Sequence, residues 1–386
     1  MKFPYIILLT LAFPLISHAQ LPEAQVLDSI ESNNLTLQAL RQDADALKAA
    51  ANTSRKMPDL EVSLGYLWPG RKDISASQPL DWAVISGLNR RIVEAKGLLY
   101  DNQYATSRQE ILLNARLTII EATYQTALTN LRSKRAEALA NIALFVQRRL
   151  DAGDARQMDA NNAAMAHASA LRQLALAQAD LEGTLLHLNA LNGDKPISPQ
   201  LSQFTPIALP DNFDAWFFHL IRISPQLKVS AAQASIAMGE HREARAQSAP
   251  QLSIGFMGEF SDDEKYKGVT LGVTLPLWRS RQSRNATTLS AQAAVAHHTA
   301  AVVSTRAEAQ AAWNRAKQLA KVATDMRQAI QSTSNADLLA KALEAGEISL
   351  TECLTAADIY FEAEEEALAA ERDYQIAAAQ LTACEL

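Results

Sequence analysis

Four acidic residues near the C-terminus recur at helical spacing. Asp358, Glu362, Glu365 and Glu366 are mostly three or four positions apart, which places their side chains on one face of an α-helix. Two interpretations fit this series. The residues form the solvated outer face of a helix, which is the more common case, or they form an acidic stripe along a water-filled passage. In the second case their field would concentrate cations.

The other reactive side chains do not form a pattern typical of catalysis or metal binding. His297 and His298 are adjacent, so on a helix they point about 100° apart and do not converge on one metal ion. The sequence shows no nucleophile elbow, phosphate-binding glycine loop or catalytic carboxylate pair. We therefore expect no enzyme activity and no cofactor. A formal net charge of −6 gives no support to nucleic acid as a partner.

Residues 1–19 have the composition of a cleavable secretory signal peptide. Lys2 supplies a positive charge, residues 6–15 supply a short apolar stretch, and Ser17 and Ala19 supply small side chains before the cleavage site. We therefore expect an exported chain. No later segment has the roughly 18 consecutive apolar residues of a transmembrane helix, so strands would have to make any membrane crossing.

The chain contains an internal sequence repeat, so the elements that position these residues are expected to occur twice. Three landmarks of the first half return in the same order in the second half, at a nearly constant offset of about 190 residues. The pairs are Asn34-Leu35-Thr36-Leu37 with Ser224-Pro225-Gln226-Leu227, Pro58-Asp59-Leu60 with Pro250-Gln251-Leu252, and Leu150-Asp151-Ala152-Gly153-Asp154 with Leu343-Glu344-Ala345-Gly346-Glu347. The sequence therefore predicts a first repeat at 20–192, a linker at 193–211 and a second repeat at 212–386.

Each repeat is expected to begin with a helix, at 24–56 and 212–248, followed by two strands. The strands are expected at about 59–68 and 78–87, and at about 251–260 and 267–277, because apolar residues alternate there with Ser, Gly, Thr and Glu. One apolar and one polar face is typical of a membrane barrel strand, although a soluble hairpin on a helical core would show the same alternation. Aromatic residues near the strand ends favour the membrane: Tyr66, Trp68, Trp82 and Trp278.

A long proline-free run follows each strand pair, at 88–151 and 280–344. At ~1.5 Å per residue, a helix of about 64 residues is roughly 96 Å long, too long for one globular core to cover. Gly153 and Gly346 interrupt the runs, and shorter return helices are expected at 158–191 and 350–384. Each return helix is about half as long as the outgoing helix, and the difference is close to the length of the opening helix. The opening and return helices stacked end to end would therefore form a second rod beside the outgoing helix.

The doubled architecture resembles the TolC family of outer-membrane efflux proteins over the whole mature chain. The segments Ser77-Gln78-Pro79-Leu80 through Gly87-Leu88-Asn89-Arg90-Arg91 and Gly272-Val273-Thr274-Leu275 through Trp278 are similar to the family's CzcC-like cation-efflux branch. The resemblance implies a mainly α fold with membrane β-strands. Three chains would form a long α-helical barrel, and each would contribute four strands to a twelve-stranded trimeric β-barrel.

The resemblance also implies roles at the periplasmic entrance of the duct. Asp159 stands at the first-tip position whose carboxylate pairs, in the family, with a Tyr or Arg of the second tip. Glu352 stands at one position of the family's acidic ring, and Thr355 stands at the other. Leu343 and Ile348 occupy the positions of the polar latch partners, so this chain lacks that latch.

An exposed tip is where an adaptor protein would dock, although charges there could equally be plain solvated groups. The candidate docking residues are Arg149, Asp151, Gly153, Glu344 and Gly346. The resemblance implies the exit duct of a tripartite efflux system in the outer membrane, with a periplasmic adaptor and an inner-membrane pump of the RND type as partners. A periplasmic adaptor, or a coiled-coil structural protein without a pore, is the alternative. The sequence does not distinguish metal cations from organic compounds as cargo.

Overall fold

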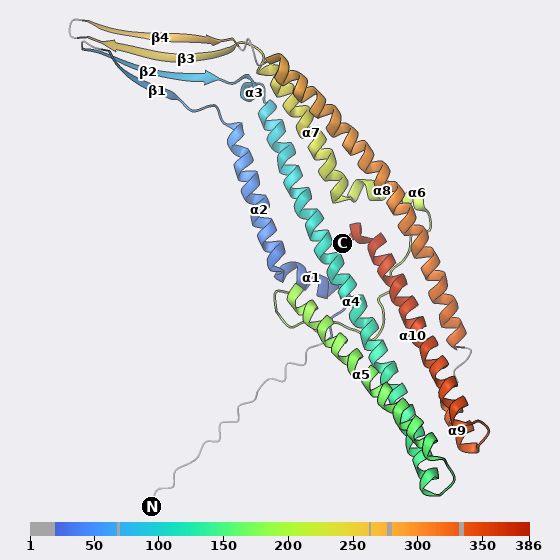
Figure 1. Ribbon diagram of the computed structural model, residues 1–386. Coiled ribbons are helices and arrows are strands. Elements are labelled where there is room, and N and C mark those ends of the chain that lie inside the picture. The colour runs from blue at the N-terminus through green and yellow to red at the C-terminus, as the bar shows by residue number, and fades with distance from the viewer. Residues whose placement is uncertain (1–19, 68–69, 262–263, 276–279, 332–335) are drawn as a thin grey trace, which may run out of the picture.

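The computed structural model describes residues 20–67, 70–261, 264–275, 280–331 and 336–386. The expected signal peptide at 1–19, and the expected interfacial residues Trp68 and Trp278, lie outside these residues. The chain forms a long, gently curved rod with a β-sheet at one end and two helical hairpin tips at the other (Figure 1). Within the described part of the chain, no helix combines the length and apolarity needed to cross a bilayer.

Each repeat opens with two helices rather than the single helix expected at 24–56 or 212–248. The first pair is separated at Asn34, whose side chain accepts a hydrogen bond from the backbone N–H of Leu37 at 2.9 Å. Ser224 separates the second pair and accepts from Leu227. Because a capping residue has a non-helical backbone, the chain bends at both points. The elements are α1 (Glu23–Asn33), α2 (Leu35–Asn52), η1 (Thr53–Arg55), α6 (Phe213–Ile223) and α7 (Pro225–Ala246).

Four antiparallel strands form one sheet in the order β1-β2-β3-β4, so the pairing of β2 with β3 joins the two repeats. The second strand, expected at about 78–87, is wrong in position. Asp81 ends it early, because its side chain accepts from the backbone N–H of Ala83 and starts the short helix α3 (Trp82–Ile85). The strands are β1 (Glu61–Leu67), β2 (Arg71–Leu80), β3 (Gln251–Phe260) and β4 (Lys265–Thr274).

The long helices run from the sheet to the tips (Figure 1). α4 (Leu88–Asp151) is one helix of 64 residues, and α5 (Gln157–Leu191) returns beside it. In the second repeat α8 (Ser280–Gln331) and α9 (Ala336–Ala345) make the outgoing run, and residues 332–335 lie outside the described residues. α10 (Leu350–Leu381) returns and is followed by the short η2 (Ala383–Glu385), which shortens the return helix expected at 350–384.

Opening and return helices meet end to end at mid-height. The Asn34 amide donates to the carbonyl oxygen of Leu191 at 2.8 Å, and Asn192 accepts from both Ser29 and Asn33. In the second repeat the residues that follow α10 reach the start of the opening helices, since Cys384 packs against the aromatic cluster of Phe213 and its neighbours. α2 with α5, and α7 with α10, therefore form the second rod of each repeat.

Candidate channel entrance and sheet

The two hairpin tips turn by the same hydrogen-bonding pattern. Gly153 and Gly346 adopt left-handed φ values of 81° and 75°. In the first tip the N–H of Asp154 donates to the Arg149 carbonyl at 2.7 Å, and in the second the N–H of Glu347 donates to the Ala342 carbonyl at 2.9 Å. This is the Schellman motif, in which a glycine past the helix end satisfies carbonyls that the helix leaves free. The repeated Leu-Asp/Glu-Ala-Gly-Asp/Glu sequence thus builds two equivalent turns.

An apolar cluster packs the two tips against each other. It joins α4 and α5 of the first hairpin to α9 and α10 of the second. Leu343 is 4% exposed within it, Cys353 is fully buried, and Ile348 packs against its edge. Burial raises the pKa of the Cys353 thiol. The two positions where a polar latch was missing from the sequence are therefore occupied by side chains that hold the tips together by apolar contact.

Glu352 and Asp159 occupy equivalent positions, the third residue of α10 and of α5. Glu352 forms a capping box: its carboxylate accepts from the Ser349 N–H at 2.8 Å, and the Ser349 hydroxyl accepts from the Glu352 N–H. These hydrogen bonds lower the pKa of Glu352, whose side chain is fully exposed. Thr355 is exposed one turn further along α10, while Asp159 is half-buried. The carboxylate expected at the entrance is thus also a helix cap.

The spacing of the C-terminal acidic residues indicated one shared helix face, but the structure gives these residues different environments. Asp358 forms an ion pair with Arg135 of α4 at 2.6 Å, and Glu365 forms one with Arg132 at 2.9 Å. Residues seven apart lie on one face, two turns apart, and this face of α10 packs on α4. Arg135 and Arg132 therefore offset the charges of Asp358 and Glu365, and the acidic stripe of Asp358, Glu362 and Glu365 along a water-filled passage stays a prediction.

The exposed acidic residues of α10 begin beside this face, because Glu362 lies one turn along the helix from Asp358, which is itself exposed. Glu352, Glu362 and Glu366 are all exposed, together with Thr355 between them. The sequence analysis missed Arg132 and Arg135, which pair with two of the candidate site residues. Their spacing of three on α4 placed them on one face, but nothing in the sequence aligned α4 with α10. Arg132 also donates to the Gln173 carbonyl, so it links α10 to both helices of the first hairpin.

The candidate docking residues all lie exposed at the two tips: Arg149, Asp151, Gly153, Glu344 and Gly346. Arg149 lies over the Phe145 ring at 5.9 Å and donates to the Asp154 carbonyl, while Asp151 accepts from Gln147. These contacts hold the first tip in shape and leave both charges in solvent.

The sheet has one apolar and one polar face, because residues paired across neighbouring strands point the same way. One face carries Val62, Leu64, Ile74, Leu252, Ile254, Phe256, Val269, Leu271 and Val273, all of them exposed. The other face carries mainly Ser, Thr and Gly, with charges that pair across strands, such as Arg71 with Glu259 at 2.5 Å. Trp82, expected at a strand end, lies in α3 and donates to the Pro250 carbonyl. The sheet thus exposes an apolar face that no described residue covers.

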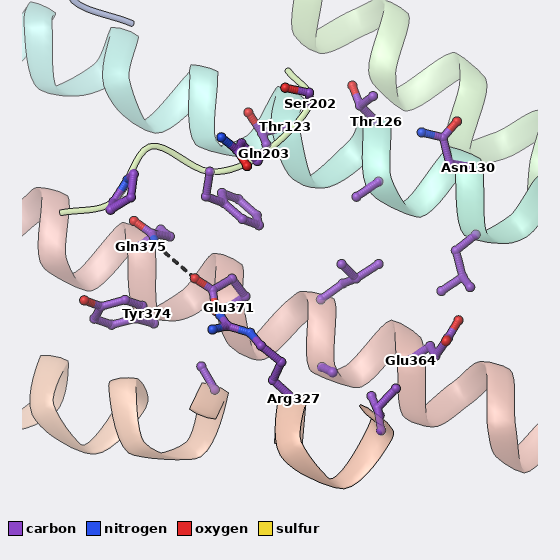
Figure 2. Close-up of a pocket in the computed structure, with 18 of the residues that line it drawn as sticks. Thr123, Thr126, Asn130, Ser202, Gln203, Arg327, Glu364, Glu371, Tyr374 and Gln375 are labelled. Atoms are coloured by element: carbon purple, nitrogen blue, oxygen red, sulfur yellow. Dashed lines mark hydrogen bonds and ion pairs between the residues drawn. The ribbon is translucent and has the colours of Figure 1, made fainter. Parts of the chain in front are cut away.

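A cavity of about 910 Å³ opens at mid-height, between α4, α8, α10 and residues 201–207 of the linker (Figure 2). Tyr374 donates to the Ile207 carbonyl at 3.0 Å and so ties the linker to α10. Glu371 accepts from Gln375 and pairs with Arg327 of α8. Polar and apolar side chains share the wall, and the linker bridges the gap between the two rods.

Two of the described histidines link neighbouring helices. His298 of α8 hydrogen-bonds the Ser230 hydroxyl of α7 at 2.8 Å, and His241 of α7 hydrogen-bonds Thr288 of α8 at 3.2 Å. Among the described residues, no group of three or more His, Cys, Asp or Glu side chains is arranged to hold a metal ion.

Solved structures match this architecture over nearly the whole chain. A membrane protein from Pseudomonas aeruginosa is 16% identical, with a TM-score of 0.79 over 94% of this chain and 93% of that one. CusC is 16% identical, with a TM-score of 0.77 over 95% and 92%. The Campylobacter jejuni CmeC outer membrane channel is also 16% identical, with a TM-score of 0.77 over 94% and 85%. No protein-family model and no curated protein matches the sequence. At these identities the likeness shows a shared fold, and the fold class expected from the sequence is thereby confirmed.

Proposed function

We propose that this chain, which has the TolC-like fold, belongs to the TolC family and is one subunit of a trimeric exit duct in a bacterial outer membrane. The observation that carries the proposal is the sheet. Its exposed apolar face would cost free energy in water, at roughly 25 cal/mol for each Å² left uncovered, and is stable against lipid. The polar face then lines the water-filled interior.

The free edges of the sheet support a trimer. In the described part of the chain β1 and β4 each pair on one side only, so each sheet leaves two edges that need partners. Four strands are too few to close a barrel around a pore, whereas three chains bring twelve. In the proposed trimer β4 of one subunit pairs with β1 of the next, and the helices extend the passage into the periplasm.

The tips are the proposed contact with other components of an efflux system. The shared Schellman turns and the apolar cluster beneath them give a firm, exposed end for a periplasmic adaptor, which would connect the duct to an inner-membrane pump of the RND type. CmeC is described as an outer membrane channel, which agrees with this placement. Glu352, with Asp159 at the equivalent position of the first repeat, is the proposed charge at the narrow entrance. The cargo is a metal cation or an organic compound.

The test combines mass and conductance on one preparation. We expect the chain purified in detergent to have the mass of a trimer and to give discrete conductance steps in a planar bilayer. A stable monomer that remains soluble without detergent and forms no channel would contradict the duct. That result would favour the alternative of a periplasmic adaptor or a coiled-coil structural protein. Either of these lacks a reason to expose an apolar sheet face.

A further inference from the structure

Charges on the sheet are sorted by face and by sign. On the face that carries the apolar side chains, every charged strand residue is a lysine: Lys72, Lys265 and Lys267. The charged strand residues of the opposite face are of both signs: Glu61, Arg71, Asp73 and Glu259. The apolar face is therefore the one of the two whose charged strand residues are all basic.

The three lysines gather at the end of the sheet far from the helices. Lys72 and Lys265 both pair with Phe260, one from each side, and Tyr66 pairs with Lys72. With strands ~4.8 Å apart, the two lysine backbones lie roughly 10 Å apart on either side of the Phe260 ring. Lys267 lies two residues further along β4. We name Lys72, Lys265 and Lys267 the basic rim.

The lysines of the basic rim are exposed and have no ionic partner among the described residues. The nearby described carboxylates interact with other partners. Glu259 pairs with Arg71 on the polar face, and Glu264 accepts a hydrogen bond from Tyr266 on that same face. Asp262 and Asp263 lie between β3 and β4, outside the described residues.

The position of the basic rim fits the boundary between hydrocarbon and headgroups. After Lys267, the same face of β4 carries Val269, Leu271 and Val273, about 14 Å of apolar strand at ~3.4 Å per residue, and the exposed Leu275 follows the end of the strand. Lysines at such a boundary place their apolar stems along the hydrocarbon and their ammonium groups among the headgroups, and aromatic rings favour the same depth. Lysine is a strong ligand for phosphate.

We propose that the basic rim binds the phosphate groups of lipids in the outer leaflet and so fixes the height of the duct in the membrane. This inference rests on the proposed function, because it needs the apolar face in lipid. The partner is a phosphorylated lipid headgroup rather than free phosphate, since the acyl chains would lie against the apolar residues directly below the lysines.

The test compares three variants of the purified trimer by native mass spectrometry. The first is Lys72→Gln with Lys265→Gln and Lys267→Gln. The second replaces the same three lysines with Arg, which preserves the charge. The third, a control with equal loss of charge, is Lys228→Gln with Lys321→Gln and Lys341→Gln on the helices, where the side chains are exposed. Each is titrated with bis-phosphorylated lipid A, with the same lipid dephosphorylated, and with inorganic phosphate as competitor.

We expect the rim-to-Gln variant to bind bis-phosphorylated lipid A about tenfold more weakly than the unmodified protein. The Arg variant and the helix control should bind it normally, and dephosphorylated lipid should bind all proteins equally. Unchanged affinity in the rim-to-Gln variant overturns the proposal, as does full displacement by millimolar inorganic phosphate. Trimer mass and conductance are recorded on the same samples. If the unmodified protein is a conducting trimer but the rim-to-Gln variant binds lipid A normally, only the lipid-binding proposal is refuted. If the unmodified protein forms no trimer and no channel, the proposed duct function is refuted.

Discussion

Leu271 offers a sharp test of which face of the sheet meets lipid. It lies within the apolar run of β4, pairs with Ile254, and is 79% exposed in the single chain. In water, a side chain that exposed contributes little to stability, and a change to Arg would alter the free energy of unfolding by less than about 0.5 kcal/mol.

In a bilayer the same substitution is costly for two reasons. Removing the leucine from hydrocarbon forfeits about 2 kcal/mol, because most of its surface would contact lipid. Placing Arg near the bilayer midplane costs a further ~2–4 kcal/mol. We therefore expect Leu271→Arg to lower the free energy of unfolding by roughly 4–6 kcal/mol per subunit, a penalty that each of the three chains incurs.

The matched control is Thr274→Arg, on the same strand but on the opposite, polar face, where Thr274 is also exposed. We expect it to cost less than about 1 kcal/mol, since the new charge would face water. The assay is urea unfolding of trimers in phosphatidylcholine vesicles, supported by the amount of folded trimer in isolated outer membranes. Equal stability of the two variants, or a greater loss in Thr274→Arg, would show that the faces are assigned the wrong way or that the sheet is not in lipid.

Glu352→Gln should weaken cation selectivity in planar bilayers while leaving trimer mass unchanged, because Gln also completes a capping box. Since the pKa of Glu352 is lowered, the cation selectivity of the unmodified protein should persist at pH values below the usual carboxyl pKa range. Reversal potentials that are the same in Glu352→Gln would show that Glu352 does not lie at the entrance. Arg108 donates to both carboxylate oxygens of Glu31 and lowers its pKa. The stability from this pair is present above the unfolded pKa and is lost as pH falls through the folded one. Glu31→Gln should therefore weaken the dependence of the melting temperature on pH across that acid range. An unchanged dependence on pH would contradict a stabilising role for the Glu31–Arg108 pair.

Much of the fold could be predicted because its sequence signals involve residues close together in the chain and occur in both repeats. The Leu-Asp/Glu-Ala-Gly-Asp/Glu sequences end helices through a left-handed glycine, and period-two alternation separates the two faces of the strands. Local signals were also present where the prediction was wrong. Asp81 is a helix-capping residue type that ends β2 at Leu80, and Asn34 and Ser224 are caps that divide the opening helices.

The candidate site shows where sequence information stops. Helical spacing placed Asp358 and Glu365 in one series with Glu362, but spacing gives only relative angles around one helix. Arg132 lies 233 positions from Glu365, and only the packing of α10 on α4 decides that their charges cancel. The same packing leaves Glu352 and Glu362 in solvent.

The sequence by itself determined the duplication, the turn residues and the amphipathic strands, because each of these depends on contacts between near neighbours in the chain. Only the tertiary structure decided that β2 pairs with β3, which brings Lys72 of the first repeat and Lys265 of the second to either side of Phe260. It likewise decided that Leu343 and Ile348 lie in an apolar cluster shared by the two tips. The reason is physical: burial and charge pairing depend on which surfaces meet, and residues far apart in the chain carry no periodic signal of one another.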